Sequence, residues 1–593
     1  MKRHFSSMII ASTVLVGSVS IPVTTNEVSA AAVQQKQIVL KEKTLVNGQE
    51  KMIEFIVLNK KKLYSATTLA HFFSAKATYD QKTKSYIFTK ENGKQRISII
   101  LKADSNIAVT NNKKVTLSVP TKLVGKSVYV DPKPFIQALG GDLFIGKNLF
   151  ISTNGLIKFE TAKLNINGEL SKVDKMKWNG KELYSVRDLA KAFSLSIKLD
   201  QNNQVILSKK NQNVTFKLDQ NTIIKNGKSI KGNTLPINVN GTIYADLKDL
   251  VTAFDGDLLT LSSGIFVSTQ GLLGGDTYNP QWINSSTLMV TNETETDSST
   301  YLISTKAKNI LKKLGIAEIT VSPNGERAVF SDESGFVSLI DLSTYKVNVL
   351  NEEDDAAKFE FVWSPDGTKI FFIHGDKSDK ISSINIHDGS ISKVYQDSFA
   401  YKSDLRLSPD GKKLLYSVGK EGTTKYSDDK NTDVDGIDLT DTEAQLYVLP
   451  LEDSEIKPIQ ITNSKDNKVF PSFLKNGNII FTSYDIEGNK LPILYQVDSK
   501  NQSTSLVSNK DIISSVVTAQ GKIMILTAES NGMFMISEVD VASKKLIEIA
   551  QTKLVLTSFS VSNDGKSIAV TTPGENGEKI MVLSNGSFEP LTK

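Results

Sequence analysis

A short turn unit recurs along the carboxy-terminal half of the sequence and limits what this half can fold into. Its clearest copy, Phe361–Phe372, contains a strand, a Ser-Pro-Asp-Gly turn and a second strand. Pro365 fixes φ at a turn position, and Asp366-Gly367 allows the positive φ of a sharp reversal. Similar turns follow Val321 and Leu407. Each copy precedes an apolar run, so the unit predicts a β-hairpin.

The unit returns at a nearly regular interval. Weaker copies turn at Gly477, Gly521 and Gly565, and a degenerate first copy lies at Trp282–Ser286. The turn positions 286, 325, 367, 411, 477, 521 and 565 are 39, 42, 44, 66, 44 and 44 residues apart. A period of about 40–45 residues with four strands per unit is typical of a β-propeller blade. We therefore predict an all-β propeller over residues 273–593, with seven blades favoured and six or eight left open.

The first 30 residues have the pattern of a targeting segment. A basic start at Lys2 and Arg3 precedes the apolar stretch Met8–Ile21, and Val28-Ser29-Ala30 fits a small-x-small cleavage site. This pattern predicts a secretory signal peptide over residues 1–30 and a secreted, cell-wall-associated protein without a transmembrane segment. The chain contains no cysteine, which excludes disulfides, thiolate metal sites and a lipid-anchored amino-terminal cysteine. A composition rich in Lys, Asn and Ile indicates a Gram-positive bacterium.

Charge is divided unevenly between the two halves of the mature chain. Residues 31–275 hold 36 Lys/Arg against 19 Asp/Glu, whereas residues 276–593 hold 32 against 45. This division favours a different partner for each half. After export, a basic surface meets anionic wall polymers or lipid head groups rather than nucleic acid. The alternative is that the lysines only keep the first half soluble, because no dense basic run occurs.

The amino-terminal half contains an internal duplication. Leu63-Tyr64-Ser65 returns as Leu183-Tyr184-Ser185, and Phe150–Thr153 returns as Phe266–Thr269. The repeat predicts two α+β modules of about 110 residues each, a usual domain size, over residues 31–155 and 156–272.

Each module has two predicted helix starts, at which a capping residue precedes two apolar residues by four and eight positions. The four capping residues are Ser65, Asp131, Ser185 and Asp246. Asp188 and Asp249 follow two of these caps by three positions and predict capping boxes with Asp in place of Glu.

The two modules resemble the N-terminal domain of copper amine oxidases, which serves as a stalk domain in secreted bacterial proteins. Asn111–Val115 leading to Val128–Asp131 carries the resemblance in the first module, and Lys225–Lys228 leading to Ile243–Asp246 carries it in the second. The resemblance implies a spacer or wall-proximal module. It does not imply amine oxidation.

Oxidase chemistry would require a copper ion held by histidines and a quinone derived from tyrosine. The mature chain has only His71, His374 and His387, which the predicted domains distribute over a module helix and the propeller repeats. We therefore expect no copper. The Ser-Pro-Asp-Gly units of the carboxy-terminal half resemble the repeats of TolB-like propellers, and we expect the Asp of each turn to be structural.

The spacing of 66 residues between turn positions 411 and 477 exceeds the repeat period by about 22 residues, which we place in an insertion after Val418. Carboxylate and amide side chains alternate in this insertion ahead of Gly436, as in the first half of a Ca²⁺ loop. The twelfth position is Thr442 rather than Glu, so the EF-hand pattern is incomplete. The candidate ligands of a structural Ca²⁺ are Asn431, Asp433, Asp435, Asp441 and Glu443. The alternative is a solvated acidic loop.

Together these patterns favour an exported, non-enzymatic binding or scaffold protein. The modules would act as spacer and wall adaptor, and a propeller face would bind a protein or a glycan. No Gly-x-Ser-x-Gly elbow of an α/β-hydrolase occurs, and we assign no catalytic or cofactor-binding residue. The alternative is a propeller enzyme, a hydrolase or lyase acting on a sugar, lactone or peptide, with charged residues converging on the central channel. A third hypothesis is salt-dependent self-assembly of the oppositely charged halves.

Overall fold

The structure is a computed structural model, which describes most of the chain after the predicted signal peptide. The described residues are 37–92, 95–145, 149–178, 180–202, 204–210, 212–218, 220–239, 241–316, 318–427, 434–438, 442–452, 457–485 and 487–593. The predicted signal peptide lies outside these ranges. Within them, no helix combines the length and the apolar character needed to cross a bilayer. By its contacts the chain divides into two compact units, one of residues up to Val46 and Glu50–Leu143, the other of Asn47–Gln49 and Phe144–Lys593.

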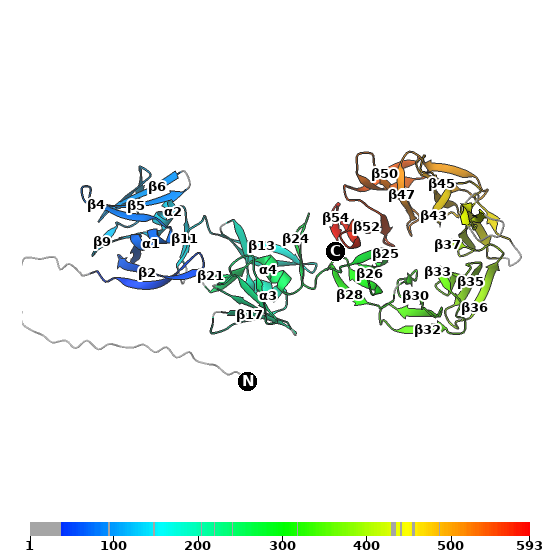
Figure 1. Cartoon of the computed structure of the whole chain (residues 1–593), viewed down its shortest axis with the longest axis horizontal. Helices are drawn as coiled ribbons and strands as arrows, with labels where there is room; N and C mark the ends of the chain where they lie inside the picture. The colour runs from blue at the N-terminus through cyan, green and yellow to red at the C-terminus, as the bar shows by residue number, and fades with distance from the viewer. Residues whose placement is uncertain are drawn as a thin grey trace, which may run out of the picture. The chain divides into compact units, whose positions relative to one another are not determined.

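The two amino-terminal modules share one order of elements: three strands, a helix, seven strands, a second helix and two strands (Figure 1). The first module consists of β1 (Leu40–Val46), β2 (Gln49–Leu58), β3 (Lys61–Ser65), α1 (Ala66–Phe72), β4 (Lys76–Asp80), β5 (Ser85–Asn92), β6 (Gln95–Lys102), β7 (Ile107–Thr110), β8 (Lys113–Thr116), β9 (Lys122–Val124), β10 (Ser127–Val130), α2 (Pro132–Ala138), β11 (Asp142–Ile145) and β12 (Leu149–Ser152). Its strands form a seven-stranded sheet in the order β11-β12-β1-β2-β3-β10-β9 and a five-stranded sheet, β4 to β8.

The second module repeats this plan. It consists of β13 (Lys158–Ile166), β14 (Glu169–Trp178), β15 (Lys181–Ser185), α3 (Val186–Ala192), β16 (Ser196–Leu199), β17 (Gln204–Lys209), β18 (Gln212–Lys217), β19 (Thr222–Lys225), β20 (Lys228–Lys231), β21 (Ile237–Val239), β22 (Thr242–Ala245), α4 (Leu247–Ala253), β23 (Asp257–Leu261) and β24 (Gly264–Ser268). The sheets have the orders β21-β22-β15-β14-β13-β24-β23 and β16 to β20, which match those of the first module strand for strand. The duplication seen in the sequence is therefore a duplication of the fold.

All four predicted helix caps are confirmed. The side chains of Ser65, Asp131, Ser185 and Asp246 accept hydrogen bonds from backbone N–H groups in the first turns of α1, α2, α3 and α4. Each cap satisfies an amide that the helix leaves without an internal partner. This requirement explains why the same residue types recur at these four positions.

The predicted capping boxes are wrong. Asp188 Oδ2 accepts from the backbone N–H of Asp174 at 3.0 Å, and both carboxylate oxygens of Asp249 accept from the backbone N–H of Asn233. A capping box needs a side chain that reaches back to the amide of the capping residue. Aspartate is one methylene shorter than glutamate, and here its carboxylate binds a neighbouring strand or loop instead.

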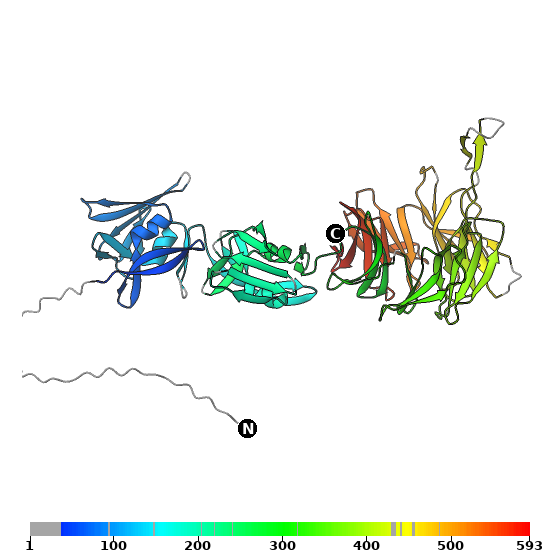
Figure 2. The same ribbon diagram turned by 60° about the horizontal axis from the view of Figure 1, so that its bottom comes forward.

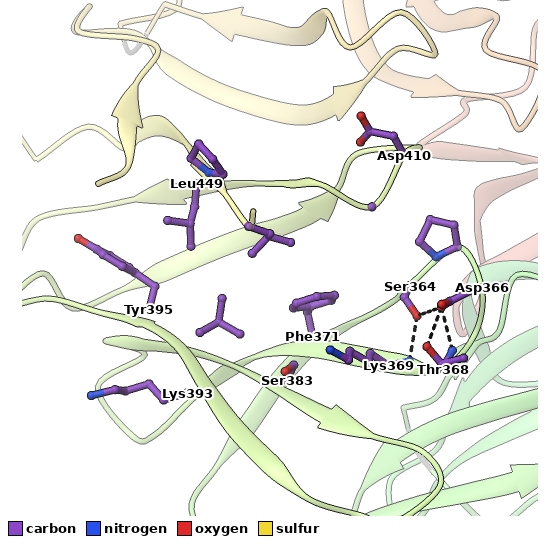
Figure 3. Close-up of a pocket in the computed structure, with 15 residues that line it drawn as sticks. Ser364, Asp366, Thr368, Lys369, Phe371, Ser383, Lys393, Tyr395, Asp410 and Leu449 are labelled. Atoms are coloured by element: carbon purple, nitrogen blue, oxygen red, sulfur yellow. Dashed lines mark hydrogen bonds between the residues drawn. The ribbon is translucent and has the colours of Figure 1, made fainter. Parts of the chain in front are cut away.

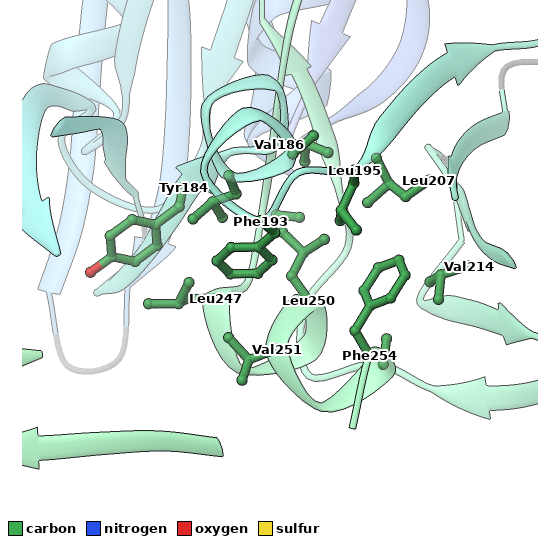
Figure 4. Packing of buried hydrophobic residues seen from close by; sticks show 14 of the residues in the cluster. Tyr184, Val186, Phe193, Leu195, Leu207, Val214, Leu247, Leu250, Val251 and Phe254 are labelled. Carbon is green, nitrogen blue, oxygen red and sulfur yellow. The ribbon is translucent and has the colours of Figure 1, made fainter. Parts of the chain in front are cut away.

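The core of the second module brings together residues of its two helices and of both its sheets. Phe193, Leu250 and Phe254 lie side by side in this core (Figure 4), and Val205, Leu207, Val214 and Phe216 cover it from the sheet. The apolar residues placed four and eight positions after each cap are all buried, together with neighbours such as Val186 and Val251. The helix signal and the core signal in the sequence have the same physical origin.

The carboxy-terminal part folds into seven consecutive four-stranded antiparallel sheets among the described residues, arranged around a common centre (Figure 1). The first three are β25 (Asp276–Asn284), β26 (Thr287–Glu293), β27 (Ser298–Ser304), β28 (Asn309–Lys313); β29 (Thr320–Val321), β30 (Arg327–Ser331), β31 (Val337–Asp341), β32 (Val347–Asn351); and β33 (Lys358–Trp363), β34 (Lys369–His374), β35 (Lys380–Asn385), β36 (Ile391–Gln396). The fourth is β37 (Lys402–Leu407), β38 (Lys413–Val418), β41 (Gln445–Pro450), β42 (Ile459–Gln460), and its insertion forms the hairpin β39 (Thr423–Tyr426) and β40 (Val434–Asp438).

The last three sheets continue the same pattern. They are β43 (Asn467–Phe473), β44 (Ile479–Tyr484), β45 (Ile493–Val497), β46 (Ser503–Val507); β47 (Asp511–Val517), β48 (Ile523–Ala528), β49 (Phe534–Asp540), β50 (Lys545–Thr552); and β51 (Ser558–Val561), β52 (Ile568–Gly574), β53 (Gly577–Ser584), β54 (Ser587–Pro590). Each sheet shares a buried apolar cluster with the next one along the chain. Burial of apolar surface between the sheets is thus the main force that holds them side by side.

The first and seventh sheets also share such a cluster. Trp282 and Leu288 of the first sheet pack with Ile580 and Val582 of the seventh. The backbone adds to this junction, because Glu578 N–H donates to Asp276 Oδ1 at 2.7 Å. The end of the chain therefore packs against the beginning of the carboxy-terminal part.

The Asp of the recurring turn has the structural role that the sequence predicts. Asp366 Oδ1 accepts from Ser364 Oγ at 2.6 Å, from Thr368 N–H at 3.1 Å and from Thr368 Oγ1 at 2.9 Å. These hydrogen bonds, led by that from Ser364, lower the pKa of Asp366 to about 2. Asp410 accepts the same kind of bond from its own turn serine.

Candidate functional site

The connections between strands lie at two ends of the sheets, which we call the loop face and the turn face. The loop face consists of the connections from the second to the third strand of each sheet and from each sheet to the next, at 294–297, 314–319, 332–336, 352–357, 375–379, 397–401, 419–444, 461–466, 485–492, 508–510, 529–533, 553–557 and 575–576. The turn face consists of the other connections, at 285–286, 305–308, 322–326, 342–346, 364–368, 386–390, 408–412, 451–458, 474–478, 498–502, 518–522, 541–544, 562–567 and 585–586.

Hydrogen bonds between neighbouring sheets confirm that both kinds of loop-face connection lie together. The N–H of Tyr401, which precedes the fourth sheet, donates to Lys377 O in the second-to-third-strand connection of the third sheet at 3.0 Å. Lys402 N–H donates to Ser378 O in the same way. This arrangement follows from up-and-down topology, in which alternate connections share one end of a sheet.

The two faces differ strongly in charge. Among the described residues, the loop-face connections hold 21 Asp/Glu against 7 Lys, whereas the turn-face connections hold 7 against 10. The acidic excess of the carboxy-terminal half is thus concentrated on one face. Such a concentration creates a local negative potential that attracts cationic surfaces and steers their approach.

The first strand of a sheet lies nearest the common centre in Figure 1, and we call it the innermost strand. In four of the sheets this strand carries a recurring irregularity near the loop face. Asn279, Glu360, Asp404 and Phe470 have φ of 52, 54, 55 and 56°, and a break in strand register spans each of them. Glu360, Asp404 and Phe470 each lie three positions before the last residue of their strand. Asn279 lies three positions before Trp282, the equivalent residue of the first sheet. A left-handed conformation of a non-glycine residue costs about 1–2 kcal/mol, so its fourfold repetition indicates a selected feature. Bulges of this kind redirect side chains and often lie beside binding sites.

A cavity of about 530 Å³ opens beside these bulges. Its walls come from the first four sheets and include Asn279, Gln281, Glu318, Phe359 and Glu360. Its lining therefore combines two carboxylates, two lysine ammonium groups, two amides and two aromatic rings. This set can bind hydroxyl groups or a cationic group through hydrogen bonds and ring contacts.

The lysines of this cavity are occupied by the protein itself. Lys358 is buried, and its ammonium group donates to Gly335 O, Asp354 O and Ala356 O at 2.9, 2.7 and 2.8 Å. Because an ammonium group has three protons, these carbonyls saturate it. Lys402 makes equivalent bonds to Asp397 Oδ1 and Phe399 O.

Lys468 occupies the corresponding position in the fifth sheet and donates to two carbonyls of the preceding connection. Each of these three lysines precedes a left-handed bulge residue by two positions. Sequence reasoning missed this pattern, although the pairs Lys358/Glu360, Lys402/Asp404 and Lys468/Phe470 are visible in the sequence once the repeat is aligned.

Polar side chains also join one innermost strand to the next. Glu360 Oε2 accepts from Leu405 N–H at 2.8 Å, which fixes its carboxylate between the third and fourth sheets. Gln281 Nε2 donates to Ile319 O at 3.1 Å and links the first and second sheets. Glu318 is exposed, so its carboxylate is available to a ligand.

Exposed aromatic side chains lie at or near the same end of the sheets. Phe359, Phe399, Tyr401 and Phe470 are between 37% and 50% exposed. They come from the innermost strands of the third and fifth sheets and from the connection that precedes the fourth sheet. Exposed aromatic rings grouped on one face are typical of interaction sites.

A serine, a histidine and an aspartate form a hydrogen-bonded chain near this cavity. His374 Nδ1 lies 2.9 Å from Ser382 Oγ, and His374 Nε2 lies 3.2 Å from Asp354 Oδ2. These residue types can perform nucleophilic catalysis. Ser382, however, is only 1% exposed and His374 only 6%, so the hydroxyl group does not face a substrate. The geometry supports a structural network that anchors the connection at 352–357.

This network predicts that acid destabilises the carboxy-terminal sheets. Burial lowers the pKa of His374 below its usual value, although the Asp354 carboxylate opposes this shift. The unfolded chain therefore binds a proton at a higher pH than the folded chain does. Stability should fall as the pH drops from about 7.5 to about 5.5, through and below the unfolded pKa of histidine.

The measurement is urea unfolding of the full chain at both pH values. His374→Gln should flatten the pH dependence, whereas His387→Gln, at an exposed residue, should leave it unchanged. Equal slopes for the wild type and His374→Gln would contradict this role for His374.

A second cavity, of about 580 Å³, lies between the third and fourth sheets at the turn face (Figure 3). Lys369, Lys393 and Tyr395 line it together with Asp366 and Asp410. The two aspartates are bonded within their own turns, as Figure 3 shows for Asp366. This cavity is therefore a weaker candidate than the one at the loop face.

The insertion after Val418 forms a hairpin that projects from the loop face (Figure 2). Of the candidate Ca²⁺ ligands, Asp435 is exposed on β40 and Glu443 lies just before β41. Asn431, Asp433 and Asp441 lie outside the described residues. In the part of the chain that the structure describes, no group of three His, Asp or Glu side chains is placed to hold a metal ion. The proposed Ca²⁺ loop stays a prediction.

Two segments of the chain, residues 45–147 and 165–259, match the family model of the copper amine oxidase N-terminal domain. The resemblance of the two modules to this domain is therefore confirmed. No curated protein sequence matches the chain significantly.

Several solved structures resemble the chain at low sequence identity. A puromycin-hydrolysing peptidase of Mycobacterium tuberculosis is 13% identical, with a TM-score of 0.40 over 54% of this chain and 53% of that one. An oligogalacturonate lyase in complex with manganese is 12% identical, with a TM-score of 0.39 over 54% and 86%. A protein described as TolB from Agrobacterium tumefaciens is 15% identical, with a TM-score of 0.31 over 43% and 87%. The match spans about half the length of the peptidase.

Proposed function

We propose that this chain is an exported, non-enzymatic binding protein of the bacterial cell surface. Its seven carboxy-terminal sheets close into a seven-bladed propeller whose loop face binds a protein or a glycan. The two amino-terminal modules act as spacer and wall adaptor. The exposed aromatic rings of the loop face, one of which, Phe359, lines a polar cavity there, carry this proposal.

The polar groups near the cavity support binding rather than catalysis. The ammonium group of Lys358 is saturated by carbonyls, and Glu360 is fixed by an amide of the next sheet. The hydroxyl group of Ser382 is buried. These groups hold the walls of the cavity in place. Exposed Glu318 and the aromatic rings are the groups that a ligand would meet.

The inserted hairpin belongs to the same proposal. A Ca²⁺ ion bound by some of the carboxylates between residues 431 and 443 would order the insertion beside the loop face. No other cofactor is needed for binding.

Substitution of two loop-face aromatic residues is expected to weaken ligand binding. Phe359→Ala combined with Tyr401→Ala removes two exposed rings, and each ring at an interaction site contributes about 1–2 kcal/mol. Binding of the full chain to purified cell-wall glycan, and to secreted proteins, should therefore fall by at least about tenfold. Cosedimentation and surface plasmon resonance would measure this loss.

The matched control changes apolar residues of similar exposure away from the loop face. Val347 on β32 and Val541 in a turn-face connection are 48% and 39% exposed. Val347→Ala combined with Val541→Ala should leave binding unchanged. If both double variants bind equally well, the loop face is not the binding surface.

A further inference from the structure

We propose that the loop face binds the lysine-rich outer face of the β16–β20 sheet in a second copy of this chain. This inference rests on the proposed function, because it names the partner of the same face. It gives the basic second module a role beyond that of a spacer.

The five strands β16 to β20 contain six lysines and no aspartate or glutamate. Strand register separates their side chains into two faces. Val205, Leu207, Val214, Phe216 and Ile223 are buried in the module core. Residues that alternate with these point to the other side, which we call the outer face.

The outer face presents lysines together with half-buried isoleucines. Three of the six lysines lie on the outer face, because Lys198 pairs with Ile206, Lys217 with Gln204 and Lys231 with Thr222. The other three, Lys209, Lys225 and Lys228, alternate with these and lie on the core side of the sheet. Ile206 and Ile224, on the same side, are only partly buried. The outer face therefore combines positive charge with apolar surface and, among its described residues, contains no carboxylate.

The loop face has the complementary composition. It has a threefold excess of Asp/Glu over Lys in its connections, and it exposes the rings of Phe359, Phe399 and Tyr401. Lysine ammonium groups bind both carboxylates and aromatic faces. Opposite potentials steer two such surfaces together, while contact between rings and isoleucines excludes water. The turn face, with 7 Asp/Glu against 10 Lys, lacks this complementarity.

A contact of this kind makes self-association depend on salt. Sedimentation velocity of the full mature chain should show dimers or longer assemblies at about 0.05 M salt, and dissociation to monomers at about 0.5 M salt, because screening shortens the reach of surface charges. The apparent dissociation constant should rise at least about tenfold over this range. A chain that is monomeric at both salt concentrations would overturn the inference.

Charge reversal on each surface tests the pairing itself. Glu318→Lys with Glu353→Lys changes the loop face at two exposed residues, and Lys217→Glu with Lys231→Glu changes the outer face. Each double variant alone should remain monomeric at low salt. A mixture of the two should associate again, since each then supplies the intact surface that the other lacks. Failure of the mixture to associate would contradict the pairing, provided that both variants retain the circular dichroism of the wild type.

The matched control makes the same change in net charge on the turn face. Glu326→Lys with Glu452→Lys should leave self-association at the wild-type level. If this control dissociates the assembly equally, only the total charge matters and the loop face has no specific part.

The two proposals can fail separately. The loop-face charge variant and the wild type are also tested for binding to cell-wall glycan. If the chain is monomeric but the loop-face variant still loses glycan binding, the further inference is wrong and the proposed function stands. If self-association follows the predicted pattern but no foreign ligand binds, the loop face serves assembly alone.

Discussion

Replacement of Lys308 by methionine is expected to destabilise the carboxy-terminal sheets by about 3–5 kcal/mol. Lys308 lies between β27 and β28 of the first sheet, and its ammonium group contacts Glu589 Oε2 of the seventh sheet at 3.3 Å and Pro590 O at 3.0 Å. The side chains of Lys308 and Glu589 are only 3% and 8% exposed. Burial lowers the pKa of Lys308, and the nearby Glu589 carboxylate opposes that shift.

The expected loss comes mainly from the carboxylate that remains. Glu589 Oε1 is already buried and has no hydrogen-bond partner among the described residues, so removal of Lys308 would leave a buried charge without compensation. Replacement of both residues, Lys308→Met with Glu589→Met, should recover most of the stability, because a pair of apolar side chains pays no such penalty. Urea unfolding followed by tryptophan fluorescence would measure all three proteins.

Lys306 provides a close control for this experiment. It lies two residues away and pairs with Glu169, but both side chains are largely exposed, at 66% and 76%. An exposed ion pair contributes at most about 1 kcal/mol, so Lys306→Met should have little effect. Similar losses for Lys306→Met and Lys308→Met would show that the buried pair does not hold the first and seventh sheets together.

Replacement of Lys358 by methionine is expected to cost about 2–4 kcal/mol, because several buried carbonyls lose a charged donor. The ammonium group joins Gly335 O, in the connection at 332–336, to Asp354 O and Ala356 O, in the connection at 352–357. Both connections belong to the loop face. The substitution should therefore loosen the wall of the cavity as well as lower global stability.

Hydrogen exchange separates these two effects. Amides of residues 332–336 and 352–357 should lose protection in Lys358→Met at denaturant concentrations far below the unfolding transition. Lys369→Met, at an exposed lysine on β34 of the same sheet, should leave both stability and protection unchanged. Unchanged protection in Lys358→Met would mean that the lysine does not organise the loop face.

The sequence predicted those features that depend on local chemistry. The turns around Asp366 and Asp410 and the caps at Ser65 and Asp246 follow from a few adjacent residues. The hydrogen bonds of these turns and caps join residues at most five positions apart, so the local sequence is enough to predict them. The repeat period then gave the arrangement of strands in each sheet.

Features that depend on neighbouring sheets were not predicted. Lys358 looked like an ordinary surface lysine until the structure placed it against carbonyls from two connections. His374, Ser382 and Asp354 come from two strands and a connection, and no spacing rule joins them. Asp188 and Asp249 matched a helix-cap pattern, but their carboxylates bind partners outside the helix. In each case the partner is distant in sequence or lies on another element.

The charge division of the loop face lies between these two cases. The composition of the carboxy-terminal half gave its acidic excess, and the aligned strands were needed to assign that excess to one set of connections. The candidate site was therefore predictable in its overall charge. Its cavity, its bulges and its buried lysines were not.

The last residues of the chain pair with the segment that leads into the first sheet. Leu273 forms a parallel bridge with Thr592, and the N–H of Lys593 donates to Leu273 O at 2.8 Å. Mechanical tension transmitted from the amino-terminal modules would enter the sheets at Leu273. It would load these bonds first, so rupture would begin at the seam between the first and last sheets and spread outward from there. Pulling on the amino-terminal modules would therefore act first on the contact between the first and last sheets.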